Sequence, residues 1–378
     1  MSSPEAGFLH AITADRSDDT ARLVYADWLD EADEPERASY LRLQVELVRT
    51  WWYDNPCTEL YARLAELAKR LDKTWLATVR RCTTPASPVN VEAIVPDVRG
   101  RAKTTVRLHP RRGKAAVDAS KIGGMFLWPK KEPWPRCPLH DNLPYVTALQ
   151  LRKEAVPELS FPLGKDLFQL LWCPEEHEID YELSPMPQVI WRERGAVREF
   201  RKIAPTSTRQ GGRSRITPRA CVIHPERVTE YPDGSEFQHF EPEMDYENPL
   251  IDATLASLKP HGGPESSSHL YQYWISVAGG VKVGGYPGWI HRAEYPQCSC
   301  GAQMEHLLSF DSREDNGGRW QALEDRPKPN ATGFAQQLAW DKPICNPLGC
   351  SFGDGGTVYV FVCRKCDGWP IRTTCQFS

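Results

Sequence analysis

"KVGGYPGWIHRAEYPQCSCG", residues 282–301, repeats the pattern of "KIGGMFLWPKKEPWPRCPLH", residues 121–140. Both stretches begin with Lys-aliphatic-Gly-Gly and place a cysteine at the same distance after the lysine. Two adjacent glycines suit a tight turn with positive φ. When Lys282 is laid over Lys121, the coincident pairs are Lys121/Lys282, Gly123/Gly284, Gly124/Gly285, Pro135/Pro296, Cys137/Cys298 and Arg152/Arg313. We interpret the repeat as an internal duplication of a β-rich unit.

Strand patterns follow each copy of the repeat. "YVTALQLR" at 145–152 and "HLLSFDSR" at 306–313 both alternate like a half-buried strand. Further on, "DLFQLLWC" ends at Cys173 and "TVYVFVC" ends at Cys363, so each copy has a later strand that carries a cysteine at its end. Cys363 follows Cys173 at a longer distance than Lys282 follows Lys121. The second copy therefore has the longer insertion between its strands.

The second copy contains a C-x-C pair, Cys298 and Cys300, and a C-x-x-C pair, Cys363 and Cys366, with a long stretch of chain between them. Two close thiolate pairs far apart in sequence are typical of a tetrahedral four-thiolate zinc site. The alternative is a set of buried free thiols. A redox-active C-x-x-C is disfavoured because no thioredoxin-like βαβ pattern surrounds it.

The first copy carries two mixed pairs at the matching places. Cys137 and His140 form C-x-x-H, and Cys173 and His177 form C-x-x-x-H. The register predicts a second zinc site of two thiolates and two imidazoles, the alternative being a decayed site with surface histidines. We therefore expect two zinc ions per chain, with one as the fallback. Neither set leaves an open position for catalysis.

The remaining cysteines have less definite roles. Cys345 and Cys350 flank "NPLG" and could replace one of the named ligands. Cys57, Cys82 and Cys221 are interpreted as scattered buried thiols. Because no secretory signal is evident, twelve cysteines favour reduced thiols or metal ligands over disulfides.

Three stretches of the second copy resemble the YwqG-like family, an uncharacterised bacterial domain. They are 285–291, 307–312 and 352–361, with His291 and Phe352 where the family has Gln and Trp. Ser120 to Trp128 and Cys298 to Gly301 also resemble motifs of the programmed-cell-death-protein-2 family, although no proline follows Gly124 closely. That second resemblance implies a chaperone-like role in protein binding, without catalysis.

The N-terminal stretch 1–82 has a helical pattern. Ser17, Asp18 and Asp19 offer N-cap groups, and Pro35 can begin the next helix. A third amphipathic helix is predicted from Leu60 through Leu64, Leu67 and Leu71 to Trp75. The stretches 8–12, 18–31 and 35–44 resemble the repeat-companion domain that is common in planctomycetes. That resemblance implies no chemistry, and Asp27 and Asp30 are expected on a solvated face.

Charge and composition limit the function. The net charge is −4, and the sequence lacks a stretch apolar enough to span a membrane, so we expect a cytoplasmic protein. Residues 192–219 hold nine Arg or Lys, and 226–247 hold eight Asp or Glu, which favours a charged excursion that pairs with itself. Phe200 is the one aromatic in the basic block, which argues against nucleic-acid binding. Residues 259–269 look like a flexible linker.

The predicted fold class is α+β: a helical module, residues 1–82, followed by a duplicated, β-rich zinc-binding body. The body comprises a first half at 83–190, a charged insertion at 191–270 and a second half at 271–378. Common hydrolase and phosphate-binding motifs are missing from the sequence. We therefore expect a zinc-stabilised adaptor or chaperone-like protein that binds an unidentified protein partner. Alternatives are a toxin-immunity protein, or a small-ligand binder or enzyme that uses a cleft between the halves, with His291, His306 and Asp354 as conceivable acid–base residues.

Overall fold

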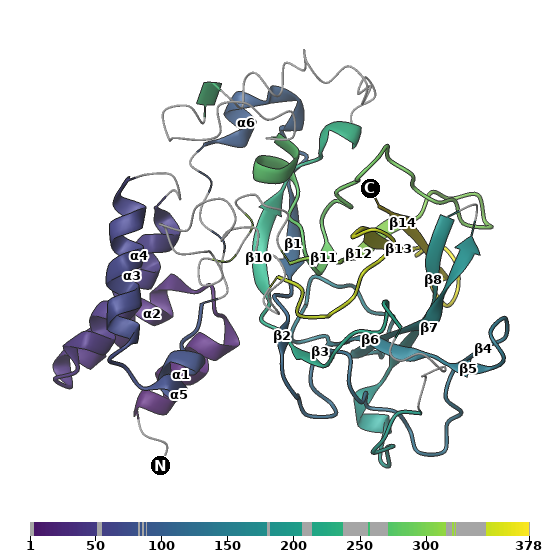
Figure 1. The fold of residues 1–378 in the computed structure, drawn as a ribbon, viewed down its shortest axis with the longest axis horizontal. Helices are drawn as coiled ribbons and strands as arrows, with labels where there is room; N and C mark the ends of the chain where they lie inside the picture. The colour runs from purple at the N-terminus through teal and green to yellow at the C-terminus, as the bar shows by residue number, and fades with distance from the viewer. Residues whose placement is uncertain are drawn as a thin grey trace. The chain divides into compact units, whose positions relative to one another are not determined.

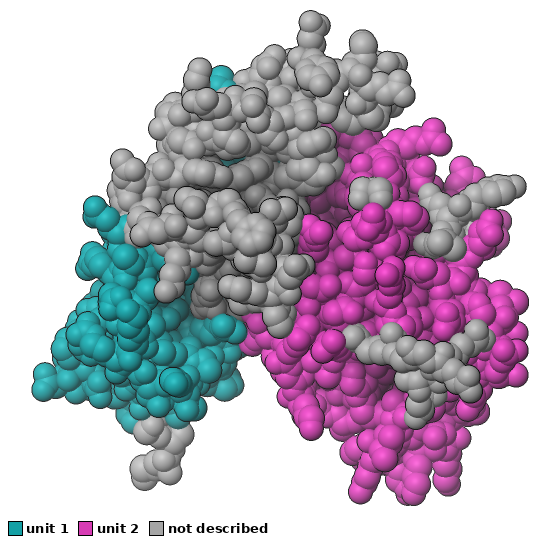
Figure 2. All heavy atoms as spheres, viewed as in Figure 1, with its two compact units in different colours: residues 1–102, 243–276, 316–336 teal, residues 103–242, 277–315, 337–378 magenta. Residues whose placement is uncertain are grey.

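The computed structural model describes residues 4–50, 55–81, 84, 87, 89–179, 182–205, 214–236, 256–257, 271–314, 320, 322 and 345–377. The chain divides into two compact units, coloured separately in Figure 2. Unit 1 comprises residues 1–102, 243–276 and 316–336, and unit 2 comprises residues 103–242, 277–315 and 337–378. Helices occupy the N-terminal part and strands the body, which confirms the α+β class. The predicted linker at 259–269 and Cys82 lie outside the described residues.

Unit 1 is built from short helices. They are α1 (Pro4–Ala14), α2 (Asp19–Glu31), α3 (Pro35–Arg49), α4 (Asn55–Ala68), α5 (Lys73–Thr78), α6 (Val91–Ile94), the 3-10 turn η1 (Pro96–Val98) and the π-helical turn η6 (Tyr271–Ser276). Among the three predicted capping residues, Asp18 caps α2 and accepts hydrogen bonds from the backbone N–H groups of Thr20 and Ala21. Pro35 is the first residue of α3, where its missing N–H costs nothing.

The predicted third helix is interrupted. α4 ends at Ala68, and α5 begins at Lys73 instead of continuing the same helix through Leu71 to Trp75. The physical reason is Asp72, whose carboxylate accepts a hydrogen bond from the Trp75 backbone N–H at 2.8 Å and so caps a new helix. The apolar spacing is kept across the break, which is why the sequence pattern resembles one helix.

A buried polar contact holds α2 and α3 together. Arg22 is fully buried, and its guanidinium donates to the side-chain oxygen of Gln44 and to the carbonyl of Val79, both at 2.7 Å. On the outer surface Asp27 and Asp30 form ion pairs with Arg42 at 2.7 Å. The two aspartates thus occupy an exposed helix face, as the sequence pattern predicts.

Unit 2 contains two six-stranded sheets and one small hairpin (Figure 1). The first sheet has the order β10 (Glu226–Glu230), β1 (Lys103–Arg107), β11 (Lys282–Gly284), β12 (Glu305–Asp311), β13 (Thr357–Val362), β14 (Ile371–Gln376). The second sheet has the order β2 (Arg111–Arg112), β9 (Cys221–Val222), β3 (Lys121–Ile122), β6 (Val146–Arg152), β7 (Leu167–Ile179), β8 (Glu182–Arg192). β4 (Arg136–Cys137) and β5 (Leu143–Pro144) form the separate hairpin. Short 3-10 turns lie at η2 (Arg194–Ala196) and η3 (Gly234–Glu236).

The two sheets repeat one register. Lys121 pairs with Gln150 in the second sheet, and Lys282 pairs with Ser309 in the first. β6 has an irregularity between residues 147 and 149, and β12 has one between 306 and 308, at the equivalent place. All four glycines of the two Gly-Gly turns have positive φ, between 61° and 75°. The same chain path is therefore built twice around the two Lys-aliphatic-Gly-Gly stretches.

The register corrects the alignment of the strands that follow. Gln150 is equivalent to Ser309, so these strands are offset by two positions fewer than the two lysines that they pair with. Arg152 therefore matches Asp311, and the coincidence of Arg152 with Arg313 does not reflect structural equivalence. The cause is a shorter turn in the second copy: the backbone N–H of Tyr145 bonds to Pro135 O, and that of Met304 bonds to Pro296 O two positions sooner.

Strands from the predicted insertion take part in both sheets. β9 and β10, residues 221–230, belong to the segment that the sequence assigns to the charged connection. β9 joins the second sheet and β10 joins the first. Arg192 and Arg194, at the start of the basic block, form ion pairs with Glu132 and Glu154. Residues 221–230 of the excursion are thus part of the sheets of unit 2.

One apolar core lies between the sheets of unit 2. Trp172, fully buried on β7, contacts the ring of Phe310 on β12 edge-on, with the centroids 5.0 Å apart. At the far strands, the hydroxyl of Ser184 on β8 donates to that of Thr373 on β14 at 3.0 Å.

Among the described residues, the helices are all too short or too polar to cross a bilayer.

Candidate metal centres

The first half brings Cys137 and His140 together on the β4–β5 hairpin. Cys137 pairs with Leu143 across the hairpin, and the N–H of Leu143 donates to His140 O at 2.7 Å. Asp141 and Asn142 complete the turn with φ of 47° and 54°, a conformation that these two residue types tolerate. The hairpin therefore holds a thiol and an imidazole at a fixed spacing.

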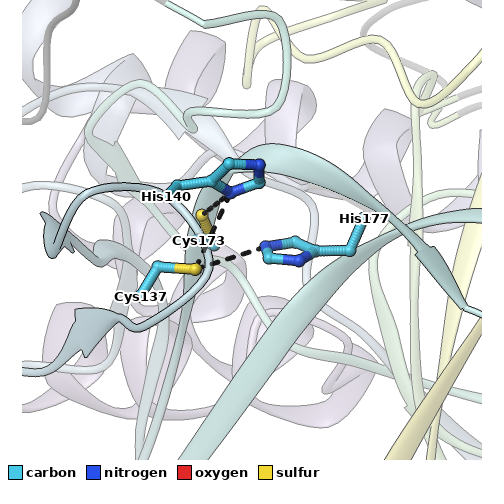
Figure 3. Close-up of side chains that lie close together, drawn as sticks. All are labelled: Cys137, His140, Cys173 and His177. Atoms are coloured by element: carbon cyan, nitrogen blue, oxygen red, sulfur yellow. Dashed lines mark hydrogen bonds between the residues drawn. The ribbon is translucent and has the colours of Figure 1, made fainter.

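The long strand β7 supplies the other two residues of this group, Cys173 and His177. A register shift between Trp172 and Glu176 interrupts the ladder with β8 next to Cys173. Figure 3 shows the four side chains converging from the hairpin and the strand. Cys137, Cys173 and His177 are buried, and His140 is half-buried. We call Cys137, His140, Cys173 and His177 the Cys2His2 group.

Its separations fit a tetrahedral ion. The Sγ of Cys137 lies 3.7 Å from His140 Nδ1 and 3.6 Å from His177 Nε2, and His140 Nδ1 lies 3.3 Å from Cys173 Sγ. Tetrahedral zinc with Zn–S of about 2.3 Å and Zn–N of about 2.0–2.1 Å separates its ligand atoms by about 3.3–3.8 Å. All four ligand atoms lie within 4.8 Å of one another, so the group can hold a metal ion.

The second half builds its group from two turns. The N–H of Cys298 donates to Ala302 O and that of Gly301 donates to Cys298 O, which closes a tight turn around Cys300 with Gly301 at φ 82°. The second turn follows β13: the N–H of Cys363 donates to Pro370 O, and that of Trp369 donates to Cys366 O. We call residues 363–370 the knuckle, and Cys298, Cys300, Cys363 and Cys366 the four-thiolate group.

The thiols of this group face one another without disulfide bonding. Cys298 Sγ lies 3.7 Å from Cys366 Sγ, and Cys300 Sγ lies 3.7 Å from Cys363 Sγ. A disulfide would bring the sulfurs to about 2.05 Å, whereas tetrahedral zinc separates them by about 3.8 Å. The four ligand atoms again lie within 4.8 Å of one another. The sequence therefore predicts both groups correctly as spatial clusters that can hold a metal ion.

The family model described as "Domain of unknown function (DUF1963)" matches residues 120–365. The chain belongs to the DUF1963 family. YwqG-like proteins belong to the same family, so the resemblance of residues 285–361 to them is confirmed. The N-terminal repeat-companion resemblance lies outside the match and stays a prediction. Among curated proteins the search finds no match. The DUF1963 match covers seven of the eight residues of the two groups and stops one residue before Cys366.

Burial and hydrogen bonding set the ionisation of the ligands. The Cys300 backbone N–H stabilises the thiolate of Cys298 and, together with the other three thiols, lowers the pKa of Cys298 to about 6. Burial raises the pKa of the Cys173 thiol to about 12 and lowers the pKa of His177. A neutral imidazole is the form that binds a metal, whereas a buried thiol needs the charge of a cation to ionise. A bound cation would thus favour the thiolate form of Cys173, which burial alone disfavours.

Aromatic side chains that were not predicted from the sequence support both groups at equivalent positions. Trp128 and Trp134 pack 4.8 Å apart beside the Cys2His2 group, and Trp289 and Tyr295 pack 5.3 Å apart beside the four-thiolate group. Both pairs coincide when Lys282 is laid over Lys121, so the signal was present in the repeat. The aromatic contacts fix the turns that carry the cysteines.

The other candidate residues lie elsewhere. Within the described residues neither ligand group includes Cys345 or Cys350, and Cys350 packs in the core between the sheets, as does Cys221. His306 is half-buried, its Nε2 lies 2.8 Å from the hydroxyl of Ser309, and desolvation holds its pKa well below the usual value. His291 contacts Phe377 O at 2.9 Å. Asp354 is exposed in the turn before β13. The side chain of Cys57 lies outside the described residues.

Proposed function

We propose that both groups bind Zn²⁺ as a structural ion and that the chain is a zinc-stabilised, protein-binding adaptor or chaperone-like protein. The observation that carries the metal assignment is the convergence of four donor atoms in each group. All four lie within 4.8 Å of one another, and the closest pairs are 3.3–3.7 Å apart in the Cys2His2 group and 3.7 Å apart in the four-thiolate group. Soft thiolates with imidazoles favour zinc over magnesium or calcium, which prefer oxygen ligands.

Completeness of the ligand sets supports a structural role for the ions. Catalytic zinc keeps three protein ligands and leaves the fourth position to water or substrate. Each group here offers four protein ligands, and at least two of each four are buried. An ion bound by all four side chains would cross-link a hairpin to a strand end. Its binding free energy would then contribute to the stability of the fold.

Untagged protein purified without chelators is expected to contain about two zinc ions per chain by elemental analysis. Replacing Cys137 by serine should reduce the content to about one, because a single thiolate ligand is removed from one group. His291→Ala is the matched control, since His291 belongs to neither group. Metal content well below one per chain in the parent, or a loss in the control variant, would contradict the assignment.

The knuckle offers a surface suited to a protein partner. The guanidinium of Arg364 lies over the ring of Trp369, 4.7 Å from its centroid. Trp369 meets Trp191 edge-on at 5.6 Å, and these residues line a cavity of about 490 Å³ together with Lys365 and Cys366. Tryptophan and arginine are the residue types that dominate the energetics of protein interfaces. These features support partner binding next to the four-thiolate group.

Affinity purification of the chain from lysate of its native host is expected to recover one partner at equal stoichiometry by native mass spectrometry. Lys365→Glu should reduce that recovery severalfold, since it reverses an exposed charge at the rim of the cavity without touching a ligand. Lys153→Glu changes another exposed lysine, one that does not line the cavity, and serves as the control. A parent chain that elutes alone, or equal recovery with both variants, would refute partner binding at the knuckle.

A further inference from the structure

Glu230, on β10, is a fully buried carboxylate beside the second Lys-aliphatic-Gly-Gly stretch, residues 282–285. Its Oε1 accepts hydrogen bonds from Lys282 Nζ and the Ala278 N–H, both at 2.8 Å, and its Oε2 accepts from the Tyr286 N–H at 2.9 Å. The Gly-Gly turn packs directly on it: a Cβ added to Gly285 would lie 2.2 Å from Glu230 Oε2. In this half, the space behind the turn is filled by a carboxylate that belongs to the chain itself.

Strand register identifies the equivalent position in the first half. Lys282 pairs with Arg107 and, through it, with Glu226, just as Lys121 pairs with Val222 and, through it, with Arg111. Arg111 on β2 is thus equivalent to Glu226 on β10. Ala115 follows Arg111 by four residues, as Glu230 follows Glu226, so Ala115 corresponds to Glu230. The hydrogen bond from the Gly113 N–H to Ala220 O keeps this register beyond the end of β2.

Where Ala115 stands in place of Glu230, the first half has a cavity of about 500 Å³. Ala115 lines it, and so do the counterparts of all four residues that surround Glu230. Those counterparts are Val117 for Ala278, Lys121 for Lys282, Gly124 for Gly285 and Met125 for Tyr286. A Cβ added to Gly124 would meet its nearest neighbour, Ala220, at 3.4 Å, so the turn here has the room that Thr105 and Glu230 together take up in the other half.

The charged residues that line this cavity, among those that the structure describes, are all basic. Its lining, taken over the described residues, includes Lys114, Lys121, Arg201 and Lys202 and no acidic side chain. Lys121 is buried, and its Nζ donates to the carbonyls of Ala116 and Val117 at 2.7 and 3.0 Å. An ammonium has three N–H groups, so one remains for a ligand. Burial lowers the pKa of Lys121 to about 8, although the charge of Asp118 opposes the shift.

Arg201 adds a second donor that is not used within the described residues. Its Nη2 donates to Glu132 O at 3.1 Å, while its buried Nε–H has no hydrogen-bond partner there. The segment is held in place by the antiparallel bridge between Pro129 and Phe200 and by the bond from the Arg201 N–H to Trp128 O. The cavity thus combines a buried ammonium, a fixed guanidinium and two exposed lysines.

We propose that this cavity binds a carboxylate group from outside the chain, in the place that the Glu230 carboxylate occupies in the second half. A volume of about 500 Å³ exceeds what one carboxylate fills, so the ligand extends past Lys121 toward Arg201, Lys202 and the half-exposed ring of Phe200. The ligand is therefore a glutamate-like carboxylate with a second negative charge. It can be supplied by an acidic peptide segment or by a free dicarboxylate.

The test uses the full chain with zinc present and a fluorescent acetyl-Gly-Glu-Gly-Glu-Gly-amide probe, with the matching Gln peptide as its neutral counterpart. In fluorescence anisotropy at low salt, the Glu peptide is expected to bind at least tenfold more tightly than the Gln peptide. Displacement by glutarate at millimolar concentration would identify a free dicarboxylate as sufficient, whereas resistance to glutarate would identify the acidic segment. Equal binding of the two peptides, or no binding of either, overturns the proposal.

Ala115→Glu supplies the missing carboxylate from the chain itself. This variant should lose peptide binding at least tenfold and should melt a few degrees higher than Ala115→Gln, which fills the same volume without charge. Lys114→Ala combined with Lys202→Ala removes two exposed charges and should weaken the Glu peptide severalfold with an unchanged melting temperature, which keeps the proposal testable if the Ala115 variants fold poorly. Unchanged binding in folded Ala115→Glu protein overturns the assignment of this cavity.

Discussion

Cys363→Ser is expected to lose one zinc ion per chain and to unfold the first sheet of unit 2 cooperatively. Cys363 is buried directly after β13, at the start of the knuckle. Its Sγ lies 3.7 Å from that of Cys300, on the turn that also carries Cys298. Structural zinc contributes about 10–16 kcal/mol of apparent binding free energy at neutral pH in zinc-finger peptides. A whole domain is stable by about 5–15 kcal/mol, so loss of the ion removes most or all of that margin.

The measurement is thermal unfolding by circular dichroism alongside zinc analysis of the same samples. Cys375→Ser is the matched control: it makes the same chemical change at a buried cysteine of the same sheet, on β14, outside the ligand group. A buried hydroxyl in place of a thiol there should cost about 1–3 kcal/mol. If Cys363→Ser melts like Cys375→Ser and keeps its zinc, the four-thiolate assignment is wrong.

The two clusters could be predicted from the sequence because the repeat places their cysteines at matching positions. Cys298 matches Cys137 after the repeated turn, and Cys363 matches Cys173 at the end of a later strand, so each half supplies one ligand pair from a turn and one from a strand end. Sequence spacing does not reveal the two residues that the second turn lacks, because Arg313 happens to restore the old offset. Only the hydrogen-bond register separates that coincidence from structural equivalence.

The strands that complete each sheet could not be predicted from the repeat. β1 precedes the first copy, and β9 and β10 lie inside a highly charged segment that resembles a solvated excursion. Glu230 belongs to that segment and is 0 % exposed. A carboxylate is buried only when a cation and N–H donors meet it. Lys282 provides that cation from far along the chain, and no local pattern indicates such a distant partner.

Glu230→Gln is expected to cost about 3–5 kcal/mol of unfolding free energy, measured by urea denaturation at neutral pH. Lys282 is 1 % exposed, and its Nζ would keep the carbonyl of Tyr286 as a partner but lose its counter-charge. Glu305→Gln is the control, because Glu305 pairs with Arg364 at the surface, where such pairs contribute about 0–1 kcal/mol. A cost for Glu230→Gln as small as that of the control would show that the buried pair contributes no more than a surface pair.

The pH dependence and a double variant separate the loss of the charge pair from a simple loss of packing. Burial lowers the pKa of Lys282 below its usual 10.5 in the folded chain, and removal of Glu230 would lower it further. The unfolded state then binds more protons than the folded state, so the stability of Glu230→Gln should rise toward that of the parent as the pH approaches 10. Adding Lys282→Met to Glu230→Gln should recover most of the loss at neutral pH, because no unpaired charge stays buried. A deficit that stays constant with pH and is not reduced by Lys282→Met would mean that Glu230 stabilises the turn only through the N–H groups of Ala278 and Tyr286.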